Sequence, residues 1–178
     1  MKQLITSIAV VLISISTAYA GKPSAISFNG DEYTYRATET SAHQYTPADQ
    51  VDLSSHKDMI SFTFAEEVKA KSDLKPFAEN FLAAYNGKGK IIKAIAGPDP
   101  RDPSLFLLAT LTTNDKSSDA NMFLISVENQ TGVVMNYSHR IYGKNQSKAV
   151  MDWFNANGHK MESTLMSFKQ FPKAKEFK

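Results

Sequence analysis

Cysteine is absent from the 178 residues. Without thiols the chain can form no disulfide framework, so core packing must hold the folded state. The same absence excludes a thiol nucleophile and leaves no cysteine to acylate after an export signal, which excludes a lipoprotein. Whatever this chain does, it does without cysteine chemistry.

Long hydrophobic runs are also lacking, apart from one at the start of the chain. Residues 1–20 (MKQLITSIAVVLISISTAYA) combine a positive charge at Lys2, an apolar stretch to about Ile15, and an Ala-Tyr-Ala ending. This pattern predicts a signal peptide that is cleaved near Ala20-Gly21. The apolar stretch is shorter than the ~20 residues of a membrane-spanning helix. We therefore expect a soluble periplasmic or secreted protein with no stable membrane insertion after cleavage, and the missing disulfides favour a bacterial periplasm.

An excess of one charge sign is missing too. Lys and Arg number 20 against 18 for Asp and Glu, and the formal net charge is +2. A balance this close to neutral gives no field that would steer the protein to nucleic acid or to an acidic membrane. We expect no nucleic-acid partner. The basic tail 173–178 is interpreted as a frayed, solvated end.

Catalytic, metal-binding and nucleotide-binding motifs are missing from residues 21–178. There is no G-x-S-x-G elbow and no H-E-x-x-H pair, and the acidic turn 114–119 lacks the calcium-loop pattern. Ser138 and His139 are neighbours in a strand pattern, so their side chains point to opposite faces and cannot share a proton. The four histidines are scattered: His43, His56, His139 and His159. We expect no enzyme, no cofactor and no metal.

The periodicity of residues 21–178 predicts a single α+β domain with a loose N-terminal arm that reaches Asp31. The expected strands are 32–40, 59–64, 90–96, 105–113, 121–128 and 133–142, and the expected helices are 72–85 and 147 to about 168. The order β-β-α-β-β-β-β-α corresponds to an antiparallel sheet of about six strands, with a central and a C-terminal helix packed on it. Residues 41–58 are expected to be a long connection. Asn157-Gly158 interrupts the last helical pattern, where glycine costs about 1 kcal/mol.

The chain ends its last helical pattern on Leu165-Met166-Ser167-Phe168-Lys169, which is similar to an I-x-x-S-F-type close. Together with the element order over residues 32–171, this ending resembles the PsbP/Mog1/DcrB-like group of small α/β proteins. Members of that group mostly bind or assemble with other proteins and lack catalytic centres. The resemblance implies a non-enzymatic, protein-binding scaffold. It names no partner and transfers no functional residue.

Two segments supply candidate contacts to a partner. Three prolines in the loop 97–103 (GPDPRDP) fix backbone angles, which lowers the entropy lost on binding and presents the charged residues on a stiff platform. A second polar surface is expected near the end of the last strand. The candidate partner-binding residues are Asp99, Arg101, Asp102, His139 and Arg140. The structural alternatives are a rigid connection for the loop and an ordinary exposed face for the strand.

Three functional hypotheses remain open from the sequence. The first is an exported, non-enzymatic binding or adaptor protein that acts through protein–protein contacts, such as an accessory factor of an envelope complex or an immunity protein against a periplasmic toxin. The second is a carrier of a small apolar ligand, with a pocket between helix 72–85 and the sheet. The third is a hydrolase with scattered catalytic residues, which a tight polar cluster in a cleft would favour. An unpaired strand edge would also allow a homodimer.

Overall fold

Eight antiparallel strands form one sheet in the order β1-β2-β3-β4-β8-β7-β6-β5. The computed structural model describes residues 24–97 and 104–177. The strands are β1 Ala25–Phe28, β2 Asp31–Glu39, β3 Ala42–Pro47, β4 Asp58–Ala65, β5 Lys90–Gly97, β6 Leu105–Thr113, β7 Ser117–Glu128 and β8 Thr131–Tyr142. The helices are α1 Lys71–Tyr85, α2 Gln146–Met166 and the short 3-10 helix η1 Ala174–Phe177. The α+β class predicted from the sequence is confirmed.

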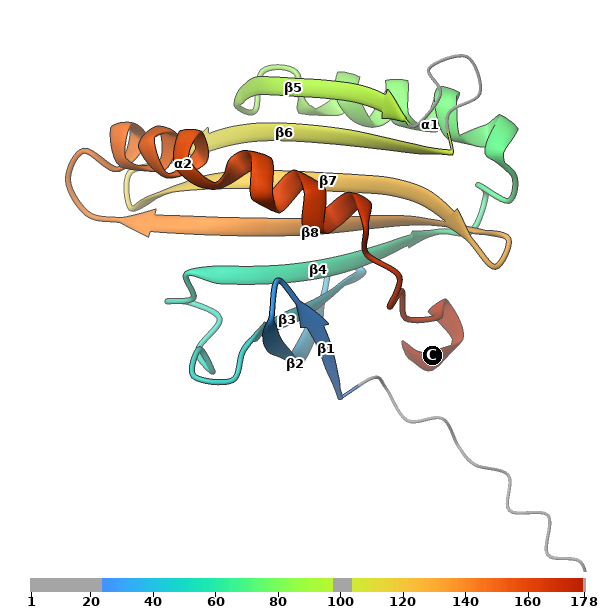
Figure 1. The fold of residues 1–178 in the computed structure, drawn as a ribbon, viewed down its shortest axis with the longest axis horizontal. Helices are drawn as coiled ribbons and strands as arrows, with labels where there is room; N and C mark the ends of the chain where they lie inside the picture. Colours follow the sequence, from blue (N-terminus) through green and yellow to red (C-terminus); the bar gives the residue numbers. More distant parts are fainter. Residues whose placement is uncertain (1–23, 98–103, 178) are drawn as a thin grey trace, which may run out of the picture.

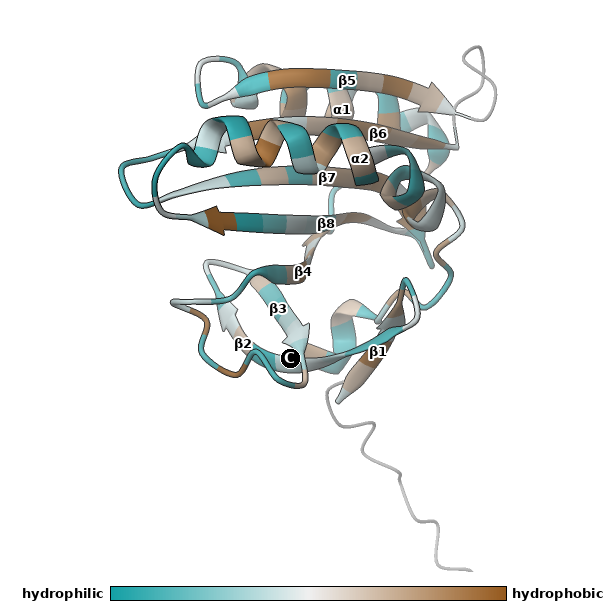
Figure 2. Cartoon of the chain, turned by 60° about the vertical axis from the view of Figure 1, so that its left-hand side comes forward, coloured by the Kyte–Doolittle hydropathy of each residue, from teal (hydrophilic) through white to brown (hydrophobic). Residues whose placement is uncertain are grey.

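The two long helices cover opposite faces of the sheet (Figure 1). On the α2 face, Met161 and Leu165 of α2 join a buried cluster with residues of the strands. On the α1 face, Leu74 and Ala78 of α1 form a second cluster with residues of β6, β7 and β8. In Figure 2, hydrophilic and hydrophobic residues alternate along α2, as expected for a helix with one face on a sheet. The central strands β6 and β7 are therefore apolar on both sides.

The sheet has eight strands where the sequence predicts about six, because β1 and β3 were missed. β1 occupies part of the predicted loose arm, and its Phe28 is 2% exposed. Asn29 and Gly30 both have positive φ and close the hairpin that joins β1 to β2. β3 lies inside the predicted connection 41–58, and its Tyr45 is fully buried. Only the remainder of that segment is a connection.

At the C-terminal end the structure resolves one question that the sequence leaves open, the continuity of the last helix, and corrects one expectation, the frayed tail. α2 runs without a break through Gly158, which is buried. The ring of Phe154 lies over that glycine, since an added Cβ would meet Phe154 Cζ at 3.2 Å. The tail is also ordered up to Phe177, whose ring stacks on His43 with centroids 3.7 Å apart. In α2, packing against the sheet outweighs the helix-destabilising effect of glycine. In the tail, packing of Phe177 on His43 outweighs the tendency of a charged chain end to stay solvated.

No helix within the described residues is both long and apolar enough to cross a membrane. The predicted signal peptide lies outside the described part of the chain. Its cleavage and the export of the protein stay predictions.

Candidate functional site

A polar concave site with buried side chains lies on the α2 face, at the start of β4 and toward the end of β8. It has a volume of about 590 Å³ and is enclosed by the β1–β2 turn, the segment after β3, the start of β4, β8 and the middle of α2. We call it the Asp58 pocket. Its members used below are Asp31, Glu32, Tyr33, Asp49, Gln50, Asp58, Tyr137, His139, Trp153 and Lys160.

Asp58 is the centre of the hydrogen bonds in this pocket. The antiparallel register places Asp58 of β4 directly opposite His139 of β8. Oδ1 of Asp58 accepts a hydrogen bond from the Tyr137 hydroxyl at 2.7 Å and lies 2.9 Å from Nδ1 of His139. Behind it, Oε1 of Gln50 accepts the backbone N–H of Asp58 at 2.9 Å. One carboxylate thus ties β4, β8 and the β3–β4 segment together.

The imidazole of His139 is held from its other side by an aromatic ring. It stacks on Trp153 of α2 with centroids 4.0 Å apart and planes 6° from parallel. The hydrogen bond between Nδ1 of His139 and Asp58 fixes the edge of the imidazole, and the stacking on Trp153 fixes its plane. A histidine oriented in this way by a carboxylate and a ring has little rotational freedom left to lose when it contacts a ligand.

The Asp58 pocket carries a fixed negative charge at its floor. Burial raises the pKa of Asp58, but hydrogen bonds from His139, Tyr137 and Gln50 outweigh it, so the pKa lies below its usual value. Burial, followed by the charge of Asp58, raises the pKa of both Tyr33 and Tyr137. The carboxyl is therefore ionised and the two hydroxyls protonated at neutral pH.

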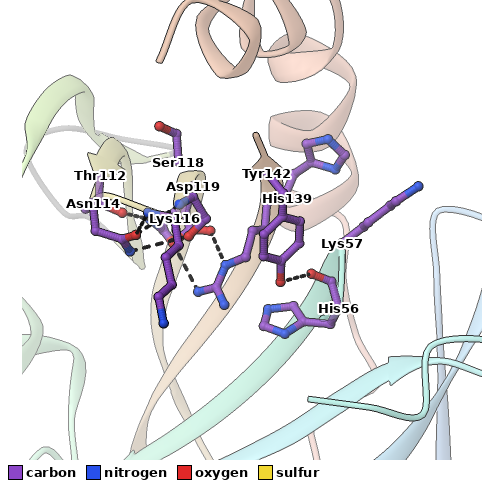
Figure 3. A network of polar contacts seen from close by, with 12 residues as sticks. His56, Lys57, Thr112, Asn114, Lys116, Ser118, Asp119, His139 and Tyr142 are labelled. Atoms are coloured by element: carbon purple, nitrogen blue, oxygen red, sulfur yellow. Dashed lines mark hydrogen bonds and ion pairs between the residues drawn. The ribbon is translucent and has the colours of Figure 1, made fainter. Parts of the chain in front are cut away.

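His139 and Arg140, which the sequence predicts as one polar surface, point to opposite faces of β8. Figure 3 shows His139 turned toward the helix and away from His56 and Asp119. Arg140 pairs with Asp119 of β7, with Nε 2.6 Å from Oδ1 and Nη2 3.1 Å from Oδ2. Its backbone N–H also donates to the carbonyl of Lys57. Arg140 therefore pairs with a neighbouring strand on the other face, and only His139 lines the Asp58 pocket. Contact of either residue with a partner stays a prediction.

The other three predicted contacts, Asp99, Arg101 and Asp102, lie outside the described residues. The Pro-rich loop is therefore still a prediction. The sequence analysis missed Asp58, Tyr137 and the role of Trp153 in the Asp58 pocket. Tyr137 and His139 are two residues apart in a predicted strand and so share one face, and this spacing could have indicated that both line the same site. Asp58 comes from a segment about eighty residues away, where only the strand register brings it close.

An apolar pocket of about 190 Å³ lies between α1 and the strands β5 and β6. Phe81 and Leu82 of α1 face Ile95 and Phe106 across it. This is the place where the apolar-ligand hypothesis expects a pocket. Within the described residues, no group of three or more histidine or acidic side chains is arranged to hold a metal ion.

Comparison with known proteins yields little. No family model matches the sequence, and no curated protein matches it. Among solved structures, a mutant of protein Mog1 matches with 11% sequence identity and a TM-score of 0.46, covering 80% of this chain and 92% of that one. Mog1 is one of the names of the group that the sequence resembles. Nothing about a partner or an activity follows from a likeness at this level.

Proposed function

We propose that this chain is exported to the periplasm or beyond, loses residues 1–20, and acts there as a soluble, non-enzymatic binding or adaptor protein. Its partner is another protein, in an accessory role on an envelope complex or as an immunity protein against a periplasmic toxin. The observation that supports binding best is the Asp58 pocket. It combines a pre-oriented polar cluster with aromatic rings, which is the composition of recognition sites in general.

The composition of the Asp58 pocket supports a binding function. Among the described residues that enclose it there is no serine, threonine or cysteine. Three of its polar side chains are bonded to one another, through the contacts of Asp58 with Tyr137 and His139. A preformed network of this kind limits the entropy cost of association.

Export and partner binding are tested separately. The full-length chain is expressed in a bacterium, and the mass of the protein in the periplasmic or culture fraction is measured. We expect a mature form that begins at Gly21. Retention of the uncleaved chain in the cytoplasm would contradict export.

Partner binding is tested by pull-down from a periplasmic extract. The variants are His139→Gln in the Asp58 pocket, with the exposed His159→Gln on α2 as the matched control. We expect one stoichiometric partner with the wild type and with the control, and its loss with His139→Gln. Failure to recover any stoichiometric partner with the wild type would overturn the proposal. A triple change of Asp99, Arg101 and Asp102 to Ala measures the contribution of the Pro-rich loop.

A hydrolase is the second candidate, and one observation favours it. His139 and Asp58 are 2.9 Å apart in a cleft, and a histidine oriented by a carboxylate can act as a general base toward water. A panel of chromogenic ester, amide and glycoside substrates tests this activity. Turnover that His139→Gln abolishes and His159→Gln retains would establish it, whereas the absence of turnover would leave the binding function as the better proposal.

The apolar pocket beneath α1 supports the remaining hypothesis, a carrier of a small apolar ligand. Its volume of about 190 Å³ is similar to that of an engineered cavity, about 150 Å³, that binds benzene. Native mass spectrometry of the purified protein would show a co-purified ligand, and a mass equal to that of the bare chain would count against a carrier.

A further inference from the structure

We propose that the Asp58 pocket binds a positively charged nitrogen group, an ammonium or a guanidinium, and that the lysine or arginine side chain of a protein partner supplies it. This inference rests on the proposed binding function and names the chemistry that the pocket recognises. Three observations carry it: the charges around the pocket, a tyrosine hydroxyl in its lining that has no hydrogen-bond partner among the described residues, and the aromatic wall.

The charges that line the pocket are unequal. Asp31, Glu32 and Asp49 stand exposed at its rim, and Asp58 lies at its floor. The side chain of Asp58 is 24% exposed, so a ligand can reach its carboxylate. The basic side chains in the lining are Lys160, which is exposed on α2, and His139, which is already bonded to Asp58. Four carboxylates that share a concave site concentrate the attraction for a cation.

Acidic residues at a rim do not by themselves make a site, and Tyr33 is the second observation. Its side chain is 3% exposed and lines the pocket, yet its hydroxyl makes no hydrogen bond with any described residue. Burial, followed by the charges of Asp58 and Asp31, raises the pKa of Tyr33, and all three residues line the pocket. The Tyr33 oxygen is not among the fully buried side-chain atoms that lack a partner, so it is open to the pocket, and a ligand N–H can donate a hydrogen bond to it.

The wall of the pocket is aromatic. Trp153 stacks on His139 with one face, and the Tyr137 ring lies 6.2 Å away from the Trp153 centroid. Aromatic rings next to ionised carboxylates are favourable surroundings for a cation and for the alkyl chain that carries it. An anionic ligand would meet four carboxylates, and a neutral apolar ligand would bring neither a charge for these carboxylates nor a hydrogen-bond donor for the Tyr33 oxygen. The pocket therefore selects a cation on a short apolar stem.

The single tryptophan of the chain lies in this pocket and provides the readout. The probes are butylammonium and methylguanidinium chloride, butanol as the uncharged control, and short blocked peptides with one Lys, Arg or Gln. We expect a saturable change in Trp153 fluorescence with both cations, with a Kd of about 1 mM or below, and none with butanol. The Lys or Arg peptide should bind at least as tightly as the free cation, and the Gln peptide should not bind.

Three variants locate the binding. Asp58→Asn should weaken cation binding about tenfold, and Asp49→Asn about twofold to fivefold. Asp49 is exposed, so its variant keeps the test decisive if Asp58→Asn fails to fold. The matched control is Asp152→Asn, which removes an exposed charge next to Trp153 that pairs with Lys148 outside the pocket. The control should bind as the wild type does.

Equal responses to butanol and to the cations, no saturable response in the wild type, or unchanged affinity in Asp49→Asn and Asp58→Asn would each overturn the proposal. Binding of free butylammonium without binding of the peptides would overturn lysine or arginine as the source and indicate a small free amine. If cations fail to bind but His139→Gln still loses the partner in the pull-down, the binding function stands and the ligand chemistry is wrong. If cations bind but no partner protein is found, the adaptor function is wrong.

Discussion

Removing a single buried oxygen should stabilise this protein. Tyr45 on β3 is fully buried, and its hydroxyl has no hydrogen-bond partner among the described residues. The ring packs edge-on against Tyr35 and Phe62, with centroids 5.4 and 5.7 Å away. Tyr45→Phe keeps the ring and its contacts and deletes only the unsatisfied hydroxyl.

The size of the effect follows from two opposing contributions. An unsatisfied buried polar group costs about 1–3 kcal/mol. The void left by the oxygen is about the size of a methyl group and costs about 1 kcal/mol. We therefore expect Tyr45→Phe to raise the free energy of unfolding by about 1 kcal/mol, which corresponds to about 2–4 °C in Tm for a domain of this size.

Tyr137→Phe is the matched control with the opposite sign. The Tyr137 hydroxyl donates to the ionised Asp58 at 2.7 Å, and a hydrogen bond to a charged group is worth about 1.5–3 kcal/mol. Equilibrium unfolding in urea, followed by the fluorescence of Trp153, compares both variants with the wild type. If Tyr45→Phe destabilises the protein as much as Tyr137→Phe does, the Tyr45 hydroxyl has a partner and the reasoning is refuted.

Three further predictions concern other parts of the fold. Gly132→Ala should cost about 1–3 kcal/mol in urea unfolding, because an added Cβ would lie 2.6 Å from the Cβ of Val68; an unchanged midpoint would contradict this packing. Phe177→Ala should speed amide hydrogen exchange in β3, because the ring stacks on His43; unchanged exchange would mean that the tail does not protect the strand. Burial lowers the pKa of His56 below 6.5, so the unfolded state takes up the proton first and stability should fall as pH drops below that value. His56→Gln should flatten this dependence in unfolding measured from about pH 7.5 to 5.5, and an unaltered slope would contradict it.

The sequence predicted elements whose pattern is local. β6 runs from Leu105 to Thr113 as expected, and α1 differs from its predicted range by one residue at its start. The hairpin at Asn29-Gly30 carried the strongest short-range turn signal and was overlooked within a polar arm. The turn at Thr40-Ser41 could not be read, because both residues adopt positive φ without being glycine or asparagine. The pairing of β2 with β3 and the side-chain hydrogen bonds Thr38–His43 and Gln44–Glu39 hold the two ends of that turn together.

The candidate site depends on pairings that no local pattern encodes. His139 was named from the sequence as a polar residue near a strand end, whereas its carboxylate partner comes from β4. Trp153 packs on the buried cluster of the α2 face, as expected for an aromatic residue in an amphipathic helix. Its contact with His139 requires the placement of α2 over β8, which is a tertiary property. The sequence can thus suggest single residues of the Asp58 pocket, but it cannot predict that they lie close together in the fold.

One sequence signal would have reduced the number of candidate site residues, and it follows from the two-residue period of a strand. Ile60 and Phe62 are fully buried on the α2 face, and Asp58 shares their phase on β4. On β8, Met135 is likewise buried, and His139 continues its phase toward the strand end. A slip of one residue in either strand would send its polar group to the other face, so burying the apolar residues also brings Asp58 and His139 together. A charged residue in the phase of the core is therefore a position where a sequence can be searched for a site before any fold is known.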